Sequence, residues 1–149
     1  MEIMFSEAAE VLWDQIGPGK NMVLATRNGK GVSARTVSAA ASEGTLVFLT
    51  FSDSRKYRQM KDRREAAFCI DGIQLTGEVT FRGLPGDEQN RVSAAAIQKA
   101  FPEWFALYSV MPGAEVIAFT PETAAVPADE KHIYTIDFVN QRAEKSAIG

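Results

Sequence analysis

Short apolar runs separated by turn signals extend through most of this chain. Residues 22–26, 32–40 and 45–51 are rich in β-branched, aromatic and other apolar side chains, which is typical of strands. The breaks between them are short, with Asn-Gly-Lys-Gly at 28–31 and Glu-Gly at 43–44. Strands joined by turns of this length pair antiparallel, so we expect a sheet built from consecutive hairpins.

The later part of the chain predicts more strands and one long loop. The segment 121–130, which begins at a proline, is predicted to be a loop, and residues 141–149 are predicted to be a frayed end. With this many strands we expect a mainly β fold, a small antiparallel barrel with a few helices packed outside it or across its mouths. The additional strands are predicted at 66–70, 75–81, 115–119 and 133–138.

Helical periodicity marks three segments. The first helix is predicted to begin with Ser6 as its N-cap and to end at the Gly-Pro-Gly that follows. A second is predicted with Tyr57 and Met60 facing inward. The third is predicted to begin at 86–88 and to end before Pro102, since the residue before a proline disfavours helix. Its predicted buried side consists of Val92, Ala95, Ala96, Ile97 and Ala100.

The composition narrows the class of protein. A chain of 149 residues has the size of one domain, so we expect a single domain over residues 1–149. The single cysteine excludes an intramolecular disulfide. One cysteine and one histidine are too few ligands for a zinc site, so no metal is expected. Cys69, between two apolar residues of a strand, is predicted to be an inert core residue. Without a basic leader or a membrane-length apolar run, a cytoplasmic location and no membrane partner are expected.

The net charge is −3, but basic residues concentrate in one segment. Mild acidity argues against a surface that binds nucleic acid. The second predicted helix, over 55–64, nevertheless holds six basic residues and one acid. Arg55 and Lys56 lie in its first turn beside Ser54, where free backbone N–H groups attract anions, so cations there indicate a ligand of opposite charge. The other cations of the segment equally suit a solvated helix face; they are Arg58, Lys61, Arg63 and Arg64.

Arg35 lies inside the predicted strand 32–40, among residues that carry hydroxyl groups. It either points to water or approaches the basic helix, because the next strand brings Thr50 near the start of that helix. An arginine fork, a lysine and two or three hydroxyls satisfy a phosphate monoester dianion. The sequence therefore predicts a phosphate site, with a flat group lying on the sheet beside it.

A longer motif surrounds these residues. The run at 48–60, Phe-Leu-Thr-Phe-Ser-Asp-Ser-Arg-Lys-Tyr-Arg-Gln-Met, resembles the F-x-T-x-x-x-S-R-K-x-x-Q segment of the pyridoxamine 5′-phosphate oxidase-like, FMN-binding split-barrel proteins. Residues 33–38 resemble the flavin-binding strand of that family, and 74–79 resemble its strand ending in Gly-x-Ala or Gly-x-Val. The resemblance covers residues 20–82 and implies a small antiparallel split β-barrel of the FMN-binding type.

The resemblance also implies a cofactor and an assembly. FMN would lie between the protomers of a homodimer, with Arg35 and Lys56 on its phosphate and the backbone of residues 36–38 along the edge of its ring. The aromatic residues from Phe101 to Tyr108 would either cover the flavin of the partner chain or pack on their own core. The implied cofactor-binding residues are Arg35, Thr36, Val37, Ser38, Leu49, Thr50, Ser54, Arg55 and Lys56.

Departures from the family's namesake limit the implied activity. The substrate-binding C-terminal segment is matched only by Arg142, and His132 is expected to be structural or exposed. The resemblance implies a flavin-dependent oxidoreductase that uses NAD(P)H or another small molecule, not an enzyme that forms pyridoxal phosphate, and no catalytic residue is assigned. Two alternatives stay open. One is a reductase of the same fold that binds the deazaflavin F420, whose acidic tail would suit the extra cations of the basic helix; the other is a non-enzymatic module that holds flavin or haem.

Overall fold

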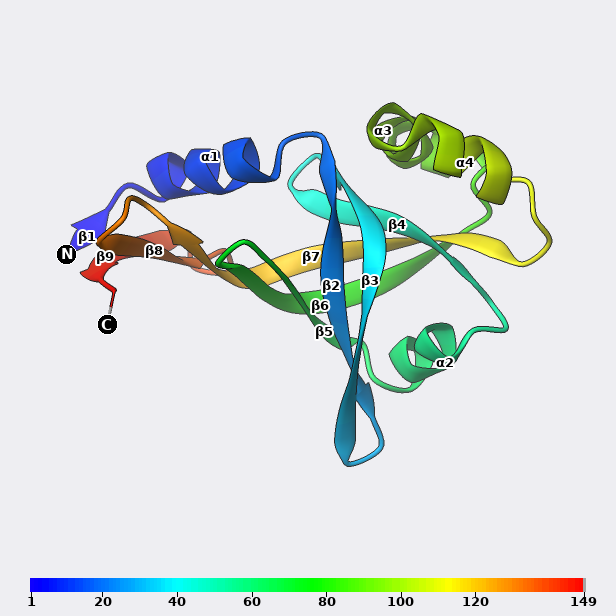
Figure 1. Ribbon diagram of the computed structural model, residues 1–149, viewed down its shortest axis with the longest axis horizontal. Coiled ribbons are helices and arrows are strands. Elements are labelled where there is room, and N and C mark those ends of the chain that lie inside the picture. Colours follow the sequence, from blue (N-terminus) through cyan, green and yellow to red (C-terminus); the bar gives the residue numbers. More distant parts are fainter. Residues whose placement is uncertain (149) are drawn as a thin grey trace.

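The computed structural model describes residues 1–148, and within them six antiparallel strands close into a barrel (Figure 1). The order around the barrel is β2-β3-β4-β7-β6-β5 and back to β2. Closure depends on β7, which pairs with β4 along one edge and with β6 along the other. The predicted antiparallel barrel is therefore confirmed. The barrel strands are β2 (Gly19–Asn28), β3 (Gly31–Ser42), β4 (Thr45–Phe51), β5 (Glu65–Ile70), β6 (Ile73–Gly83) and β7 (Ala114–Pro127).

Tight turns join the first three barrel strands, as the sequence predicts. The break between β2 and β3 falls within the Asn-Gly-Lys-Gly signal. Between β3 and β4, Glu43 and Gly44 adopt left-handed φ values of 49° and 79°, a conformation that glycine reaches without steric cost. These turns fix the register, which places Met22 opposite Val37 on the first hairpin.

Strand β7 extends through most of the segment that the sequence assigned to a loop. The prediction of a loop over 121–130 is wrong for residues 121–127, which pair with β6 and then with β8. Ala124 and Val126 are buried there and their neighbours are more exposed, which is a strand pattern. The prolines at both ends of this stretch conceal that pattern in the sequence.

A smaller sheet continues from β7 beyond the barrel and carries both ends of the chain (Figure 1). The predicted frayed end over 141–149 is wrong for residues 142–147, because β9 pairs with β8 on one side and with β1 on the other. Residue 149 lies outside the described residues. The strands of this sheet are β8 (His132–Asp137), β9 (Arg142–Ala147) and β1 (Glu2–Ile3).

Helix α1 (Phe5–Ile16) begins two residues earlier than an N-cap at Ser6 predicts. Its N-cap is Met4, and Ser6 lies inside the helix, so the predicted capping role of Ser6 is wrong. The reason is packing: the ring of Phe5 meets that of Phe138 edge to face, with centroids 5.7 Å apart. Burial of an aromatic side chain at the first helical position outweighs the weaker preference for a serine cap.

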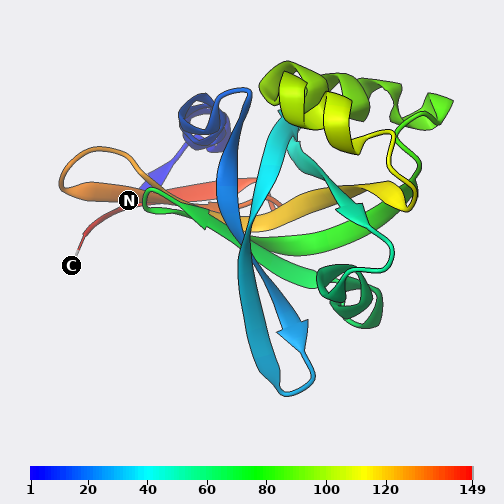
Figure 2. The same ribbon diagram turned by 45° about the vertical axis from the view of Figure 1, so that its right-hand side comes forward.

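Two further helices lie side by side over one end of the barrel (Figure 2). The predicted buried face of the first of them is partly wrong, because Val92 and Ala95 are exposed whereas Ser93 and Ile97 are buried. Ser93 and Ile97 are four residues apart and so share one helix face. The helices are α3 (Arg91–Ala100), preceded by the 3-10 turn η1 (Glu88–Asn90), and α4 (Pro102–Tyr108).

Aromatic side chains fill the barrel. The rings of Phe48, Phe68 and Phe119 are fully buried and pack edge to face, with centroids 5.7 and 5.0 Å apart. Because successive side chains of a strand point to opposite faces, an inward Phe68 places Cys69 outward. Cys69 is exposed, so its predicted place in the core is wrong.

Candidate functional site

Helix α2 (Arg55–Asp62) follows β4 and carries most of the candidate residues. Ser54 is its N-cap, and the Ser54 hydroxyl accepts a hydrogen bond from the Tyr57 backbone N–H at 3.3 Å. The helix is shorter than the predicted 55–64, because Arg63 has extended backbone angles. The first turn of the helix is therefore held in place by a serine that also lies at the anion-attracting end of the helix.

One side of α2 packs against the barrel. Met60 is fully buried, and Tyr57 packs edge to face on Phe81 with centroids 5.0 Å apart, so the predicted inward side of the helix is confirmed. The Tyr57 hydroxyl reaches both carboxylate oxygens of Glu115 at 3.1 Å. Burial, followed by this hydrogen bond and the carboxylate charge, raises the pKa of Tyr57. A helix of eight residues is marginal by itself, so these contacts set its position.

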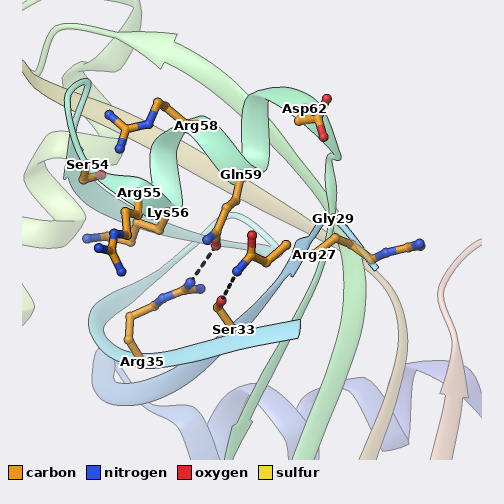
Figure 3. Close-up of a pocket in the computed structure, with 11 residues that line it drawn as sticks. Arg27, Gly29, Ser33, Arg35, Ser54, Arg55, Lys56, Arg58, Gln59 and Asp62 are labelled. Carbon is orange, nitrogen blue, oxygen red and sulfur yellow. Dashed lines mark hydrogen bonds between the residues drawn. The ribbon is translucent and has the colours of Figure 1, made fainter. Parts of the chain in front are cut away.

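The opposite side of α2 faces a cleft of about 700 Å³ between the helix and the β2–β3 hairpin (Figure 3). In Figure 3, Arg55 and Lys56 project from the first turn of α2 towards Arg35 on β3. The cleft thus collects cations from two segments that lie 20 residues apart in sequence. The residues that line this cleft include Arg35, Ser54, Arg55, Lys56, Arg58 and Gln59.

Arg35 is held by neutral acceptors. Its Nη1 donates to the Thr26 hydroxyl at 2.7 Å and to the Leu24 carbonyl at 3.1 Å, and its Nη2 donates to Gln59 Oε1 at 2.9 Å. The sequence-based expectation that Arg35 approaches the basic helix is therefore correct. Burial lowers the pKa of Arg35 from its ordinary value, because a partly dry site disfavours the charged guanidinium.

Lys56 is also partly buried beside another cation. Burial is the main cause that lowers the pKa of Lys56, and the charge of Arg35 is the second. Within residues 1–148, no ion pair links Arg35, Arg55 or Lys56 to a carboxylate. Asp62 also lines the cleft, but it lies at the other end of α2. Cations gathered without acids are stabilised by a bound anion, so this end of the cleft has the donors that a phosphate requires.

A second, smaller pocket of about 270 Å³ adjoins the first. Lys56 lines both. Strand β3 forms one wall, and Phe51 and Trp104 contribute aromatic surface. The β3–β4 pairing is limited to residues 40–42 opposite 45–47 in the described part of the chain. Half of the backbone N–H and C=O groups of a strand point to each side, so β3 presents unpaired groups along this pocket. The remaining lining residues are Asn21, Thr36, Val37, Ser38 and Leu49.

Comparison with solved structures places this architecture among known proteins. An FMN-binding protein related to pyridoxamine 5′-phosphate oxidase, from Nostoc punctiforme, is similar with a TM-score of 0.59 and 15% identity, over 97% of this chain and 93% of that one. A NimC/NimA family protein from Clostridium acetobutylicum gives 0.60 and 18%, over 97% and 95%. A haem-binding protein from Mycobacterium smegmatis gives 0.70 and 14%, over 92% of this chain and 59% of that one. No family sequence model and no curated protein sequence matches the chain.

The chain has the split-barrel fold of these proteins. The barrel is closed, but β3 and β4 pair over residues 40–42 and 45–47 and separate on the N-terminal side of residue 40, and the smaller pocket lies in that separation. The predicted fold class, a small antiparallel split barrel with peripheral helices, is confirmed. The resemblance stated from the motif around residues 48–60 led to the same fold.

The split barrel brings nearly all predicted site residues to the two pockets. Arg35, Ser54, Arg55 and Lys56 line the larger one; Thr36, Val37, Ser38 and Leu49 join Lys56 in the smaller one. Thr50 lines neither. Thr50 is buried, and its hydroxyl lies 3.2 Å from that of Ser54, so it forms a hydrogen bond with the N-cap of α2 and does not line the cleft.

Sequence reasoning assigned no role to Gln59 or Thr26, although both contact Arg35. Gln59 follows Arg55 and Lys56 by four and three residues, which places the three side chains on one helix face. That spacing was available in the sequence. Nothing in the sequence predicts the contact of Thr26 with Arg35, because a threonine in a strand is an ordinary β-branched residue there.

Other residues with uncertain roles in the sequence have structural partners. Phe101, Trp104 and Phe105 pack on the core of their own chain beneath α3 and α4, and Trp104 also lines the smaller pocket. His132 Nδ1 lies 2.9 Å from an Asp129 carboxylate oxygen, and Arg142 pairs with Glu2 at 3.3 Å. Neither His132 nor Arg142 lines the cationic cleft.

Residues 1–148 contain no cluster of three or more histidine, cysteine or acidic side chains placed to hold a metal ion. None of the helices in this range combines the length and the apolar character that crossing a membrane requires.

Proposed function

We propose that the protein binds FMN across the two adjoining pockets and acts as a flavin-dependent oxidoreductase on a small organic molecule or on NAD(P)H. The observation that carries this proposal is the position of Lys56, which lines both pockets. One ligand can therefore place an anionic group among the cations and an attached planar group beside β3. A phosphate ester of a flat heterocycle has this shape.

The donor set of the larger pocket suits the phosphate group. Arg35 offers a planar fork, Lys56 and Arg55 offer charge, and the Ser54 hydroxyl lies at the N-terminus of α2. A phosphate dianion accepts several hydrogen bonds at once, and charge-assisted bonds are about twice as strong as neutral ones. Burial, and after it the charge of Arg35, lowers the pKa of Lys56, and a bound dianion would offset both effects.

The smaller pocket suits the ring. Unpaired backbone groups of β3 offer hydrogen bonds to ring heteroatoms, and Leu49 and Trp104 offer apolar surface for the ring faces or edges. When bound, FMN supplies hydride and single-electron transfer. The chain's contribution is to bind the phosphate, to orient the ring along β3 and to exclude water with Trp104 and Phe51. No side chain of the two pockets is assigned to proton transfer.

A visible absorption spectrum of the purified protein, followed by titration with FMN, tests the proposal. We expect flavin absorbance in the purified protein or, if it is isolated free of ligand, quenching of FMN fluorescence and a higher melting temperature with FMN. Ligand that binds only the folded state raises stability by RT ln(1 + [L]/Kd), about 2.7 kcal/mol at one hundred times Kd. A colourless protein whose melting temperature does not respond to FMN contradicts the proposal. Reduction of the bound flavin by NADPH or NADH then tests the oxidoreductase part.

Deazaflavin F420 is the alternative with the same fold. Of the extra cations that its acidic tail would use, Arg58 lines the cleft, but Lys61 and Arg64 lie over the ring of Phe81 at 4.2 and 5.5 Å. This distribution favours FMN, which lacks the acidic tail. A competition titration decides the matter: displacement of FMN by an equimolar amount of F420 favours the deazaflavin.

Haem binding is a second candidate, favoured by the likeness to the haem-binding protein of Mycobacterium smegmatis. The single histidine of this chain, His132, lies on β8 and lines neither pocket of the candidate site. Iron would therefore need a different ligand there. Titration with haem checks this: a Soret shift that His132→Ala abolishes places haem elsewhere on the fold.

We also propose that the functional unit is a homodimer. The residues that line the smaller pocket do not enclose it completely, and a second copy of the chain would cover the ring. Mass photometry or sedimentation equilibrium of the purified protein tests this, and a monomer at micromolar concentration with flavin bound contradicts it.

A further inference from the structure

We propose that Gln59 and Thr26 form a neutral clamp that positions Arg35 while leaving its charge available, and that this clamp sets the preference for a phosphorylated over an unphosphorylated ligand. The inference rests on the proposed binding of a phosphate in the cleft. It assigns a positioning role to two residues that line or support the cleft, and it makes a prediction that phosphate binding alone does not make.

The clamp joins three elements. Gln59 comes from α2, Thr26 from β2 and Arg35 from β3. Gln59 Oε1 accepts from Arg35 Nη2 at 2.9 Å and from the Thr26 hydroxyl at 2.7 Å, and the Thr26 oxygen accepts from Arg35 Nη1 at 2.7 Å. Thr26 is only 2% exposed, so the triangle is built on a buried side chain. Figure 3 shows the bond from Arg35 to Gln59 across the cleft.

The orientation of the Gln59 amide follows from its neighbours. Both Arg35 Nη2 and the Thr26 hydroxyl act as donors towards Gln59. If the amide were reversed, its NH₂ group would face the guanidinium N–H, and two donors would oppose each other. The oxygen therefore points towards Arg35, and the amide presents a partial negative charge without a formal one.

Counting the donors of Arg35 shows what the clamp leaves free. A guanidinium carries five N–H groups. Nη1 uses two of them on Leu24 and Thr26, and Nη2 uses one on Gln59. Within residues 1–148, no acceptor takes Nε–H or the second N–H of Nη2. These are the two groups with which an arginine side chain can grip a phosphate edge side-on.

The neutrality of the clamp distinguishes it from the usual support of a buried arginine. A carboxylate in the place of Gln59 would form an ion pair with Arg35 and cancel much of its attraction for an anion. The Coulomb energy between unit charges at this range is large in a partly buried site. A neutral amide and a hydroxyl hold the guanidinium in place and weaken its attraction for an anionic ligand less than a carboxylate would. The side chain at position 59 therefore determines how much charge the cleft offers.

Gln59→Glu tests this directly, because it keeps the size and the bond to Arg35 and adds one negative charge. The readout is the ratio of the Kd for riboflavin to the Kd for FMN, since the two ligands differ only in the phosphate. In the native protein we expect FMN to bind more tightly, and in Gln59→Glu we expect the ratio to fall about tenfold to a hundredfold, with riboflavin affinity unchanged. Gln98→Glu on the exposed face of α3 adds the same charge away from the cleft and should leave the ratio unchanged.

Thr26→Val and Thr26→Ser form an independent pair that does not add charge. Valine has a similar shape without the hydroxyl, so we expect the ratio to fall about fivefold to tenfold, whereas serine should restore it. Circular dichroism and the melting temperature establish that each variant is folded. Direct binding of inorganic phosphate, measured by isothermal titration and expected to be weaker in Gln59→Glu than in the native protein, provides a readout without flavin.

The outcomes separate the two proposals. If the native protein binds neither flavin, or binds both equally, the proposed function fails and the clamp fails with it. If the native protein prefers FMN and Gln59→Glu, folded, retains that preference, the clamp is overturned while the proposed function stands. A fall in the ratio for Gln59→Glu and Thr26→Val, with recovery in Thr26→Ser, supports the clamp.

Discussion

The two sides of helix α2 are built from opposite kinds of interaction. On the barrel side, Met60 is buried, Tyr57 is bound to Glu115, and Lys61 lies 4.2 Å from the centre of the Phe81 ring. On the cleft side, Arg55 and Lys56 face Arg35 without a paired carboxylate among residues 1–148. The helix is therefore satisfied on one side and electrostatically incomplete on the other.

This difference separates stability from binding within one short helix. Contacts on the barrel side hold the helix whether or not a ligand is present. On the cleft side, burial and the charge of Arg35 lower the pKa of Lys56, so its charge is disfavoured in the ligand-free protein, and we expect it to gain a partner when an anion binds. We therefore expect substitutions on the two sides to have different consequences.

The largest effect is expected for Met60→Ala. Removing a fully buried methionine leaves a cavity, which lowers the free energy of unfolding by about 2 to 5 kcal/mol. Urea denaturation followed by circular dichroism measures it. Met111→Ala, at a methionine that is 39% exposed, is the matched control and should change stability by about 0.5 kcal/mol or less. Equal losses of unfolding free energy in the two variants would contradict the assignment of the barrel side of α2 to stability.

Lys56→Met should have the opposite signature. Loss of a charge-assisted contact weakens FMN binding by about 1.5 to 3 kcal/mol, while the ligand-free protein becomes no less stable, because a cation that is partly buried beside Arg35 is gone. Isothermal titration and thermal unfolding without ligand measure the two quantities. Lys99→Met, at an exposed lysine of α3, should leave both nearly unchanged. A clear loss of stability in ligand-free Lys56→Met would contradict the comparison.

Tyr57→Phe should cost about 0.5 to 1.5 kcal/mol of stability, because Glu115 loses its donor. The pKa of Tyr57 is raised in the folded protein, so its stabilising contribution is complete below the ordinary value of 10.0 and is lost as pH rises through the folded value. Unfolding measured between neutral and strongly alkaline pH should therefore show a smaller alkaline loss in Tyr57→Phe. Tyr108→Phe, whose hydroxyl has no hydrogen-bond partner among the described residues, serves as the control.

The smallest effect concerns the pH dependence of binding. Anion binding needs the protonated Lys56 ammonium, and its pKa lies below the ordinary 10.5, so FMN affinity should begin to fall at a lower pH than an ordinary lysine would cause. Lys56→Arg should extend binding to higher pH, since arginine stays charged. Kd values measured across the alkaline range check this. Identical pH profiles for the two proteins would show that Lys56 does not contribute its charge to the ligand.

Local signals in the sequence predicted the elements that local chemistry determines. The Asn-Gly-Lys-Gly and Glu-Gly turns gave the correct hairpins, because left-handed backbone at a glycine needs no distant partner. The end of α1 at Gly17 and the cationic first turn of α2 were read correctly for the same reason. Most of the candidate site could be predicted from the sequence because it lies on β3 and α2, within the stretch that carries the motif.

Elements that depend on distant partners were missed. Residues 121–127 and 142–147 become strands through pairing with β6, β8 and β1, and their own composition of proline, alanine and charged residues gives a weak strand signal. Cys69 was assigned to the core because its neighbours are apolar, although alternation along the strand turns it outward. The helical spacing of Gln59 places it on the same face as Arg55 and Lys56, but its contacts with Thr26 on β2 and Arg35 on β3 lie outside any local window.

Strand β7 links the folding of the barrel to the formation of the cleft. It pairs with β4 and with β6, which closes the barrel, and it also carries Glu115, the hydrogen-bond partner of Tyr57. Pairings of such long sequence separation form late and slow the folding of β proteins. Until residues 114–127 have been synthesised and docked, Tyr57 of α2 lacks its hydrogen-bond partner Glu115. Competence to capture the ligand should therefore appear together with barrel closure, in one kinetic step, and not with the earlier hairpins.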